Sequence, residues 1–351
     1  MVSFSAVQLG TLTEVVAMTQ TRLILIAIIV CFLSPLLGGA PRARFDYYLT
    51  GDGADAIGDT TFGIGLMGGG TDVDALFTWM SGLAGGGDFV VIRASGADGY
   101  NQYVFDLGNF DSVETLVLLN RSASFDQFVL QKIQNAEALF IAGGDQSNYV
   151  NFWKGTPVED AIHDLVTKQI PIAGTSAGTA ILGEFVYAAQ RQSATSSAAL
   201  ADPFNRDITL DRDFLILPHM GGLITDQHLI ERDRIGRTLA FMARIVRDGW
   251  ASESRSIAID RETAVLVEAS GDATIVANAD HPTPYAYFIS GGVPDVCEPN
   301  TPLTYRNLAV FRAEPGSRFD IPRWAGTNGA SYTLDVVNGL ITSTQAGGSI
   351  Y

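Results

Sequence analysis

Residues 170–185 read IPIAGTSAGTAILGEF. The segment opens with the short apolar run IPIA, turns through GTSAG at 174–178, and continues into a run that can form a helix. In this strand–turn–helix context a serine is raised at the end of a sheet, and small neighbours allow the tight turn. We predict that Ser176 is a nucleophile and that the Ala177 N–H, at the start of the helix, donates to a developing oxyanion. The alternative is a tight turn in which Ser176 only caps a helix.

Short apolar runs alternate with amphipathic segments upstream of this turn. Strands separated by helical segments of this length are typical of an α/β fold, in which a mostly parallel sheet carries helices on both faces. We expect strands at residues 62–67, 89–94, 114–119, 138–142 and 170–173, and helices at 72–83, 125–136 and 158–168.

The second half of the chain has a different pattern. Residues 193–213 are small and polar and predict a loop, whereas residues 224–246 contain the longest helical pattern. After Ser256 the apolar residues follow a β pattern, and further strands are expected from about residue 303 to the end. The C-terminal part is therefore predicted to be rich in β-strands.

Composition narrows the class of protein. The 351 residues are 47% hydrophobic and 17% charged, which excludes general disorder. A net charge of −16 repels phosphate backbones, so we expect no nucleic-acid partner. The same negative charge would attract cationic substrates. The alternative is that it serves only to keep the protein soluble. Two cysteines exclude a disulfide framework, and no metal-ligand spacing is present, so we expect neither a metal nor a cofactor.

The N-terminal region contains the uncharged apolar run LILIAIIVCFL at residues 23–33. The run is shorter than the roughly 20 residues of a membrane span. It fits the apolar part of a secretory signal, with cleavage near Ala40 or Ala43, and predicts a secreted or periplasmic protein. The alternatives are a buried helix and a retained anchor, and only a retained leader would bring the chain to a membrane.

The stretch AGGDQ, residues 142–146, follows the predicted strand 138–142. Glycines at the carboxyl end of a strand let backbone N–H groups point into the crevice where α/β sheets bind ligands. Gly144 or Asp145 would supply the second oxyanion donor, and Gln146 would reach a substrate. The alternative is an ordinary glycine-rich turn, and the dinucleotide fingerprint G-x-G-x-x-G is absent.

A third stretch, DQHLIERDRIGR at residues 226–237, combines one histidine with three arginines. A histidine at a helix N-terminus stays neutral, as a general base requires. His228 is therefore the candidate base, and Arg232, Arg234 and Arg237 on the following turns would fix carboxylates. The alternative is a solvated helix face with ion pairs between successive turns.

Together, GGDQ, GTSAG and DQH-x3-R-x-R-x2-R, in that order, resemble the cyanophycinase and aspartyl dipeptidase group of serine peptidases. The stretch YYLTGDGADA at 47–56 is also similar to the opening of cyanophycinase-like proteins. The resemblance implies a class I glutamine-amidotransferase-like (flavodoxin-like) α/β domain over residues 45–315. Residues 1–40 would then be a leader, and residues 316–351 a C-terminal β extension.

The resemblance also implies an activity and a set of site residues. Cyanophycinases hydrolyse cyanophycin, a poly-aspartate backbone with arginines on its β-carboxylates, and release β-Asp-Arg dipeptides. Ser176 would be the nucleophile and His228 its base, and a homodimer is suggested. The substrate would contact Gln146, Asp226, Gln227, Arg232, Arg234 and Arg237.

One departure concerns the acid of the catalytic triad. The family pattern places a glutamate between the serine and histidine motifs, but residues 193–204 contain none, and Ala198 occupies the expected position. Asp202 is the only carboxylate in that tract, and Glu184 is the nearest one upstream. Either Asp202 substitutes, or a Ser–His pair works more slowly, or the chain is an inactive binding protein. A dipeptidase for Asp-X or isoaspartyl peptides is a further alternative.

Overall fold

A computed structural model describes residues 43–351 of the chain. Within it, Arg44–Tyr351 pack as one compact unit. The apolar run 23–33 and Ala40 lie outside the described residues, so the leader and the secretion of the protein stay predictions. In the described part, no helix is long and apolar enough to cross a membrane.

The first of two sheets in residues 43–351 contains ten strands. Their bounds are β1 (Phe45–Gly51), β2 (Gly63–Met67), β3 (Phe89–Arg93), β4 (Ser112–Leu118), β5 (Ala138–Ile141), β6 (Ile172–Thr175), β11 (Thr263–Glu268), β12 (Asp272–Ala277), β15 (Arg318–Asp320) and β16 (Ala325–Thr327). The spatial order is β1-β4-β3-β5-β6-β2-β11-β12-β15-β16. The strands from β4 to β2 in this order run parallel, and the remaining pairings are antiparallel.

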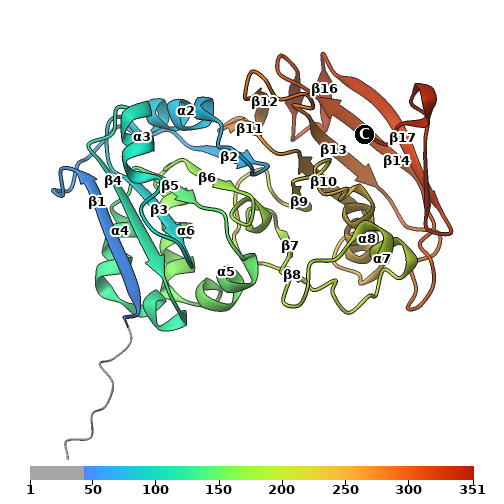
Figure 1. The fold of residues 1–351 in the computed structure, drawn as a ribbon, viewed down its shortest axis with the longest axis horizontal. Coiled ribbons are helices and arrows are strands. Elements are labelled where there is room, and N and C mark those ends of the chain that lie inside the picture. The colour runs from blue at the N-terminus through green and yellow to red at the C-terminus, as the bar shows by residue number, and fades with distance from the viewer. Residues whose placement is uncertain (1–42) are drawn as a thin grey trace, which may run out of the picture. The chain divides into compact units, whose positions relative to one another are not determined.

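Helices cover both faces of the parallel strands (Figure 1). One face carries α2 (Asp74–Ala84) and α3 (Asn101–Leu107), and the other carries α4 (Gln127–Gln134), α5 (Gln146–Trp153) and α6 (Pro157–Thr167). Phe77 of α2 packs with Phe140 of β5, whereas Ile133 and Ile162 pack on the opposite face. The parallel strands are largely apolar because both faces are buried, although β4 also carries the buried polar residues Ser112, Glu114 and Thr115.

The second sheet contains eight strands of the described chain. Their bounds are β7 (Phe185–Tyr187), β8 (Leu210–Arg212), β9 (Leu223–Gln227), β10 (Ser254–Ile259), β13 (Ala286–Gly291), β14 (Tyr305–Ala313), β17 (Ala330–Val337) and β18 (Leu340–Ser343), in the order β18-β17-β14-β13-β10-β9-β7-β8. Strand β9 runs parallel to β10 and β7. The other helical segments are α7 (Ser196–Ala201), α8 (Ile235–Arg247) and the short turns η1 (Arg121–Phe125), η2 (Thr179–Ile181) and η3 (Ala346–Gly348).

The predicted α/β class is confirmed, with parallel strands between two helical layers and a β-rich C-terminal part. The last strands extend both sheets, because β15 and β16 join the first and β17 and β18 join the second. The boundary proposed at residue 315 stays a prediction.

Three local expectations differ from the structure. The helical pattern at 224–246 is confirmed from Ile235 onward, where α8 begins, but its first residues form strand β9. The predicted loop 193–213 contains α7 and β8. After Ser176 the chain forms only the short turn η2 before it enters β7. Gly183 lies at this entry, where a Cβ would be 2.7 Å from the Leu223 carbonyl oxygen, so the chain passes against the second sheet.

Candidate active site

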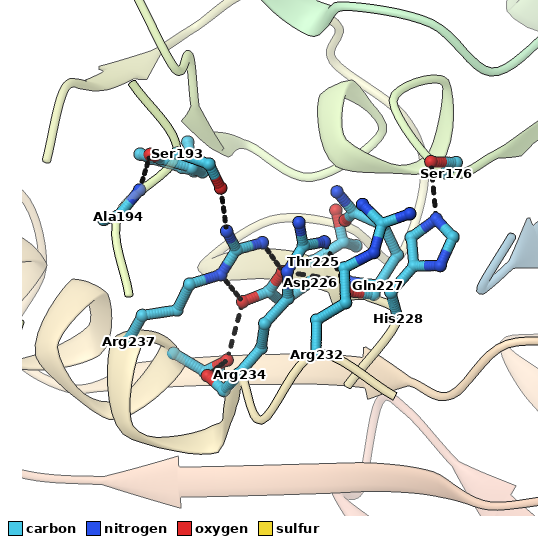
Figure 2. Close-up of polar contacts among 12 residues, drawn as sticks. Ser176, Ser193, Ala194, Thr225, Asp226, Gln227, His228, Arg232, Arg234 and Arg237 are labelled. Carbon is cyan, nitrogen blue, oxygen red and sulfur yellow. Dashed lines mark hydrogen bonds and ion pairs between the residues drawn. The ribbon is translucent and has the colours of Figure 1, made fainter. Parts of the chain in front are cut away.

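Ser176 and His228 meet although they come from different sheets. Ser176 follows the last residue of β6 in the first sheet, and His228 follows the last residue of β9 in the second. Ser176 Oγ lies 2.9 Å from His228 Nε2 (Figure 2). Both residues have left-handed backbones, with φ angles of 51° and 52°. The structure thus brings the predicted nucleophile and base within hydrogen-bond distance.

The glycines on both sides of Ser176 are required by close backbone contacts. A Cβ on Gly178 would lie 2.0 Å from the carbonyl oxygen of Ile141, at the end of β5. A Cβ on Gly174 would lie 2.6 Å from the carbonyl carbon of Gly178. The Ser176 N–H donates to the Met67 carbonyl, 3.1 Å away, at the end of β2. The G-x-S-x-G spacing therefore fits the serine between two neighbouring strand ends.

The carboxylate that orients the imidazole belongs to Glu231. Its Oε2 lies 2.6 Å from His228 Nδ1, on the side of the ring opposite Ser176. Ser176, His228 and Glu231 therefore form a hydroxyl–imidazole–carboxylate series of the kind used by serine hydrolases. No clear sequence signal marks Glu231, because it stands among charges typical of a solvated helix face.

Asp202 is not this carboxylate, which corrects the expectation for the triad acid. Its Oδ1 accepts hydrogen bonds from the N–H groups of Phe204, at 2.9 Å, and Asn300, at 3.0 Å. Glu184 is also engaged elsewhere, because its Oε2 accepts from the Gly222 N–H at 2.5 Å. The backbone at residues 228–234 forms turns rather than a helix, and this brings Glu231 back onto the ring three residues after His228.

His228 is held neutral by burial and not, as predicted, by a helix N-terminus. Helix α8 begins seven residues later, at Ile235. Burial lowers the pKa of His228; the hydrogen bond to Glu231 raises it in part, and the charges of Arg232 and Arg234 lower it again. The net pKa lies below the usual 6.5, so the ring is ready to accept a proton at neutral pH.

This pKa predicts the acid side of the pH–rate profile. Since the base must be unprotonated, kcat/KM should fall as the pH drops through the pKa of free His228, with a midpoint below 6.5. Initial rates measured from about pH 4 to about pH 8 test this, because the range extends roughly two pH units to either side of the usual histidine pKa. A midpoint clearly above 6.5 would contradict it.

Gly68 and Gly69 support the histidine, a role that the sequence did not indicate. The His228 N–H donates to the Gly68 carbonyl at 2.9 Å. Gly69 has a φ of 93°, and a Cβ there would lie 2.4 Å from His228 Nε2. The backbone after β2 therefore lies directly against the imidazole, which restricts its movement.

The predicted oxyanion donors lie beside Ser176. A Cβ built on Gly143 would be 3.5 Å from the Ser176 Cβ, so the glycine loop after β5 borders the serine. Within residues 43–351, the N–H groups of Gly144 and Ala177 have no hydrogen-bond acceptor. Asp145 is the N-cap of α5, where its side chain accepts from the Ser147 N–H. The Gly144 and Ala177 N–H groups are thus available as donors next to Ser176.

A cavity of about 260 Å³ opens next to Ser176. It includes four of the predicted substrate-binding residues, Gln146, Gln227, Arg232 and Arg234. The other lining residues are Gly144, Asp145, Ser176, Ala189, Arg191 and Ser193. Sequence reasoning missed Arg191 and Ser193. Ser193 begins the segment 193–213, whose small polar composition indicated only a loop, and Arg191 precedes that segment and belongs to none of the three motifs.

Asp226 and Arg237 do not line this cavity, which corrects their predicted contact with substrate. Arg237 is 1% exposed, and its guanidinium donates to both carboxylate oxygens of Asp226, at 2.9 and 2.5 Å (Figure 2). Arg237 also donates to Ser193 Oγ at 3.1 Å. Burial alone would raise the pKa of Asp226, but the charge and hydrogen bonds of Arg237 hold it below its usual value. The buried Asp226–Arg237 pair therefore holds Ser193, which lines the cavity, without contacting the cavity itself.

The cavity carries more positive than negative charge, in contrast to the chain as a whole. Arg191, Arg232 and Arg234 line it, against the single carboxylate of Asp145. Burial, followed by the neighbouring charge of Arg237, lowers the pKa of Arg234 to about 10, so it stays cationic at neutral pH. Gln227 Oε1 is buried and has no partner within residues 43–351. The cavity therefore suits a ligand with a carboxylate and an N–H group.

Comparisons with known proteins find a similar family, similar sequences and a similar structure. A family model described as peptidase family S51 matches residues 101–242. The cyanophycinase of Trichormus variabilis is 26% identical over 223 residues, which are 62% of this chain and 68% of that protein. The cyanophycinase of Synechococcus elongatus is 24% identical over 227 residues, 63% and 64% of the two chains. A peptidase from an acI-B1 Actinobacterium superposes with a TM-score of 0.49 at 15% identity, covering 75% of this chain and 98% of that one.

Proposed function

We propose that the chain, which is similar to peptidase family S51 over residues 101–242 and to cyanophycinases, is a serine-type peptidase that hydrolyses β-linked Asp-Arg polymer, or dipeptides derived from it, through an acyl-enzyme on Ser176. The observation that carries the proposal is the series of contacts from Ser176 Oγ to His228 Nε2, 2.9 Å, and from His228 Nδ1 to Glu231, 2.6 Å.

In the proposed first step, Ser176 Oγ attacks the carbonyl carbon of the scissile amide. His228 Nε2 takes the hydroxyl proton, and Glu231 stabilises the imidazolium that forms. The carbonyl oxygen becomes an oxyanion, which the N–H groups of Gly144 or Asp145 and of Ala177 receive. Collapse of this intermediate breaks the C–N bond, and the imidazolium returns its proton to the leaving nitrogen.

In the second step, water attacks the ester on Ser176. His228 accepts a proton from this water, and the same donors hold the new oxyanion. The ester bond then breaks, Ser176 regains its proton from His228, and the acid product leaves. Each proton taken is returned, so the protein ends the cycle unchanged.

The charges around the site support an Asp-Arg substrate. The net charge of −16 favours approach of the guanidinium groups that each Asp-Arg unit carries beside its carboxylate. Near Ser176 the local sign is reversed, because Arg191, Arg232 and Arg234 line the cavity. A β-Asp-Arg unit at a chain end has two carboxylates for these guanidiniums and N–H groups for Gln227. The proposed substrate thus matches both signs of charge.

Two alternative functions can be weighed against this proposal. A dipeptidase for Asp-X or isoaspartyl peptides would also use the arginines, because such substrates carry carboxylates on both sides of the scissile bond. An inactive binding protein is disfavoured because Glu231, although outside the segment 193–204 where the acid was expected, supplies a carboxylate to His228 Nδ1.

The experiment compares substrates on the purified protein. We expect release of β-Asp-Arg from cyanophycin, with a kcat/KM larger than that for Asp-X or isoaspartyl dipeptides; the control is the Ser176→Ala variant, which should release nothing. Faster cleavage of the dipeptides would assign the alternative peptidase activity. If no substrate is cleaved and a fluorophosphonate leaves no adduct on Ser176, the proposal fails.

A further inference from the structure

We propose that Asp260 is a positioning residue for catalysis: its carboxylate fixes the turn that holds His228 and Glu231 in register. This inference rests on the proposed function, because it assigns a role to Asp260 in the same reaction. Asp260 makes no hydrogen bond with the side chains of Ser176, His228 or Glu231. It acts through the backbone turn that carries His228 and Glu231.

The contact is made with two successive N–H groups of the turn. Asp260 Oδ1 accepts from the Ile230 N–H at 3.0 Å and from the Glu231 N–H at 3.1 Å. Asp260 itself is 1% exposed, so these bonds are shielded from water. The backbone of Glu231 is therefore fixed beside a buried charge while its side chain, 35% exposed, reaches back to His228.

The place of Asp260 in the chain explains why it can hold this turn. It lies between β10, in the second sheet, and β11, in the first, where the chain passes from one sheet to the other. The preceding residue, Ile259, accepts a hydrogen bond from the Leu229 N–H at 3.2 Å. Two consecutive residues of this crossing thus bind three consecutive N–H groups after His228.

The other carboxylate oxygen is fixed from a third segment. Asp260 Oδ2 accepts from the Thr283 hydroxyl at 2.9 Å and lies 3.3 Å from His281 Nε2. Both partners belong to the connection between β12 and β13. Because both oxygens have partners, the carboxylate has one preferred orientation, and the turn it binds has one preferred position relative to Ser176.

Accurate placement matters because a displacement of about 1 Å in a catalytic group can lower a rate by about 10²-fold. Without the Asp260 carboxylate, the N–H groups of Ile230 and Glu231 lose their acceptor, and the turn can rearrange. Glu231 would then leave Nδ1 for part of the time. Arg191 lies outside this turn, and the Arg234 guanidinium is held by the Gln227 carbonyl, 2.9 Å away, so these two proposed substrate-binding groups keep their places. The expected result is a loss in kcat with little change in KM.

The test uses three variants of the full chain assayed with cyanophycin. Asp260→Ala should lower kcat by about tenfold to a hundredfold and leave KM nearly unchanged. Asp260→Asn keeps an oxygen acceptor for the two N–H groups and should recover most of the activity. Asp202→Ala is the matched control, since Asp202 Oδ1 also accepts two backbone N–H groups, but these belong to Phe204 and Asn300 and not to the turn that carries His228 and Glu231.

The outcomes separate this inference from the proposed function. If Asp260→Ala is folded and turns over like Asp202→Ala, the inference is overturned, while labelling of wild-type Ser176 by a fluorophosphonate would still support the serine mechanism. A wild-type chain that neither cleaves the polymer nor accepts the reagent overturns both. Should Asp260→Ala not fold, Thr283→Val decides: a lower kcat at constant KM supports the inference, and an unchanged kcat overturns it.

Discussion

Replacement of Ser176 by alanine should lower kcat by about 10⁶-fold, which is the size of the loss when a serine hydrolase is deprived of its nucleophile. The reason is that Ser176 Oγ is the hydroxyl in contact with the base, 2.9 Å from His228 Nε2. Alanine keeps the backbone geometry of the turn, so the cavity and its arginines stay in place. Turnover of cyanophycin and mass spectrometry after fluorophosphonate treatment measure the two effects, loss of rate and loss of the adduct.

The control for this variant is Ser197→Ala. Ser197 is an exposed residue of α7, and its hydroxyl lies 3.3 Å from that of Thr195. Activity and labelling should both stay at the wild-type level. Normal turnover by Ser176→Ala would exclude Ser176 as the nucleophile, even if the fold and the substrate were as proposed.

Replacement of Glu231 by glutamine should lower kcat by up to about 10⁴-fold, the loss known when a triad acid becomes an amide. The carboxylate can only accept a hydrogen bond, so it keeps the proton of neutral His228 on Nδ1 and leaves Nε2 free to take the proton of Ser176. A glutamine amide can donate to Nδ1 instead, which places the ring proton on Nε2 and blocks the base. Steady-state kinetics on the polymer measure the loss.

Asp202→Ala provides the comparison that identifies the acid. Asp202 was the candidate offered by the sequence, whereas the structure places Glu231 on the imidazole. We therefore expect a large loss for Glu231→Gln and little for Asp202→Ala. The reverse order of the two losses would restore Asp202 as the acid and contradict the assignment of Glu231.

The part of the fold around Ser176 could be predicted from local sequence. Strands such as Ala138–Ile141 are apolar throughout because they are buried on both faces, and the glycines of GTSAG are needed for close backbone contacts. Both signals are contained within a few residues. For that reason the parallel strands, the helices α2, α4 and α6, and Ser176 as the candidate nucleophile could be predicted from local sequence, whereas α3 and α5 were not predicted.

The environment of His228 could not be predicted in the same way. Strand β9 is buried at all five positions, so its pattern does not distinguish it from the start of a buried helix. The charges that follow have three different roles: Glu231 binds the imidazole, Arg234 lines the cavity, and Arg237 is buried against Asp226. These roles depend on contacts with segments far away in the sequence, which no local pattern contains.

The left-handed backbone at Ser176 limits which nucleophiles this protein could ever use. At a φ of 51°, a residue branched at Cβ is a severe conformational outlier, so threonine is excluded by its extra methyl group and not by its chemistry. Cysteine has the same branching as serine and meets no such barrier. The turn at residue 176 could therefore accept a cysteine thiol in place of the serine hydroxyl, but not the secondary alcohol of threonine.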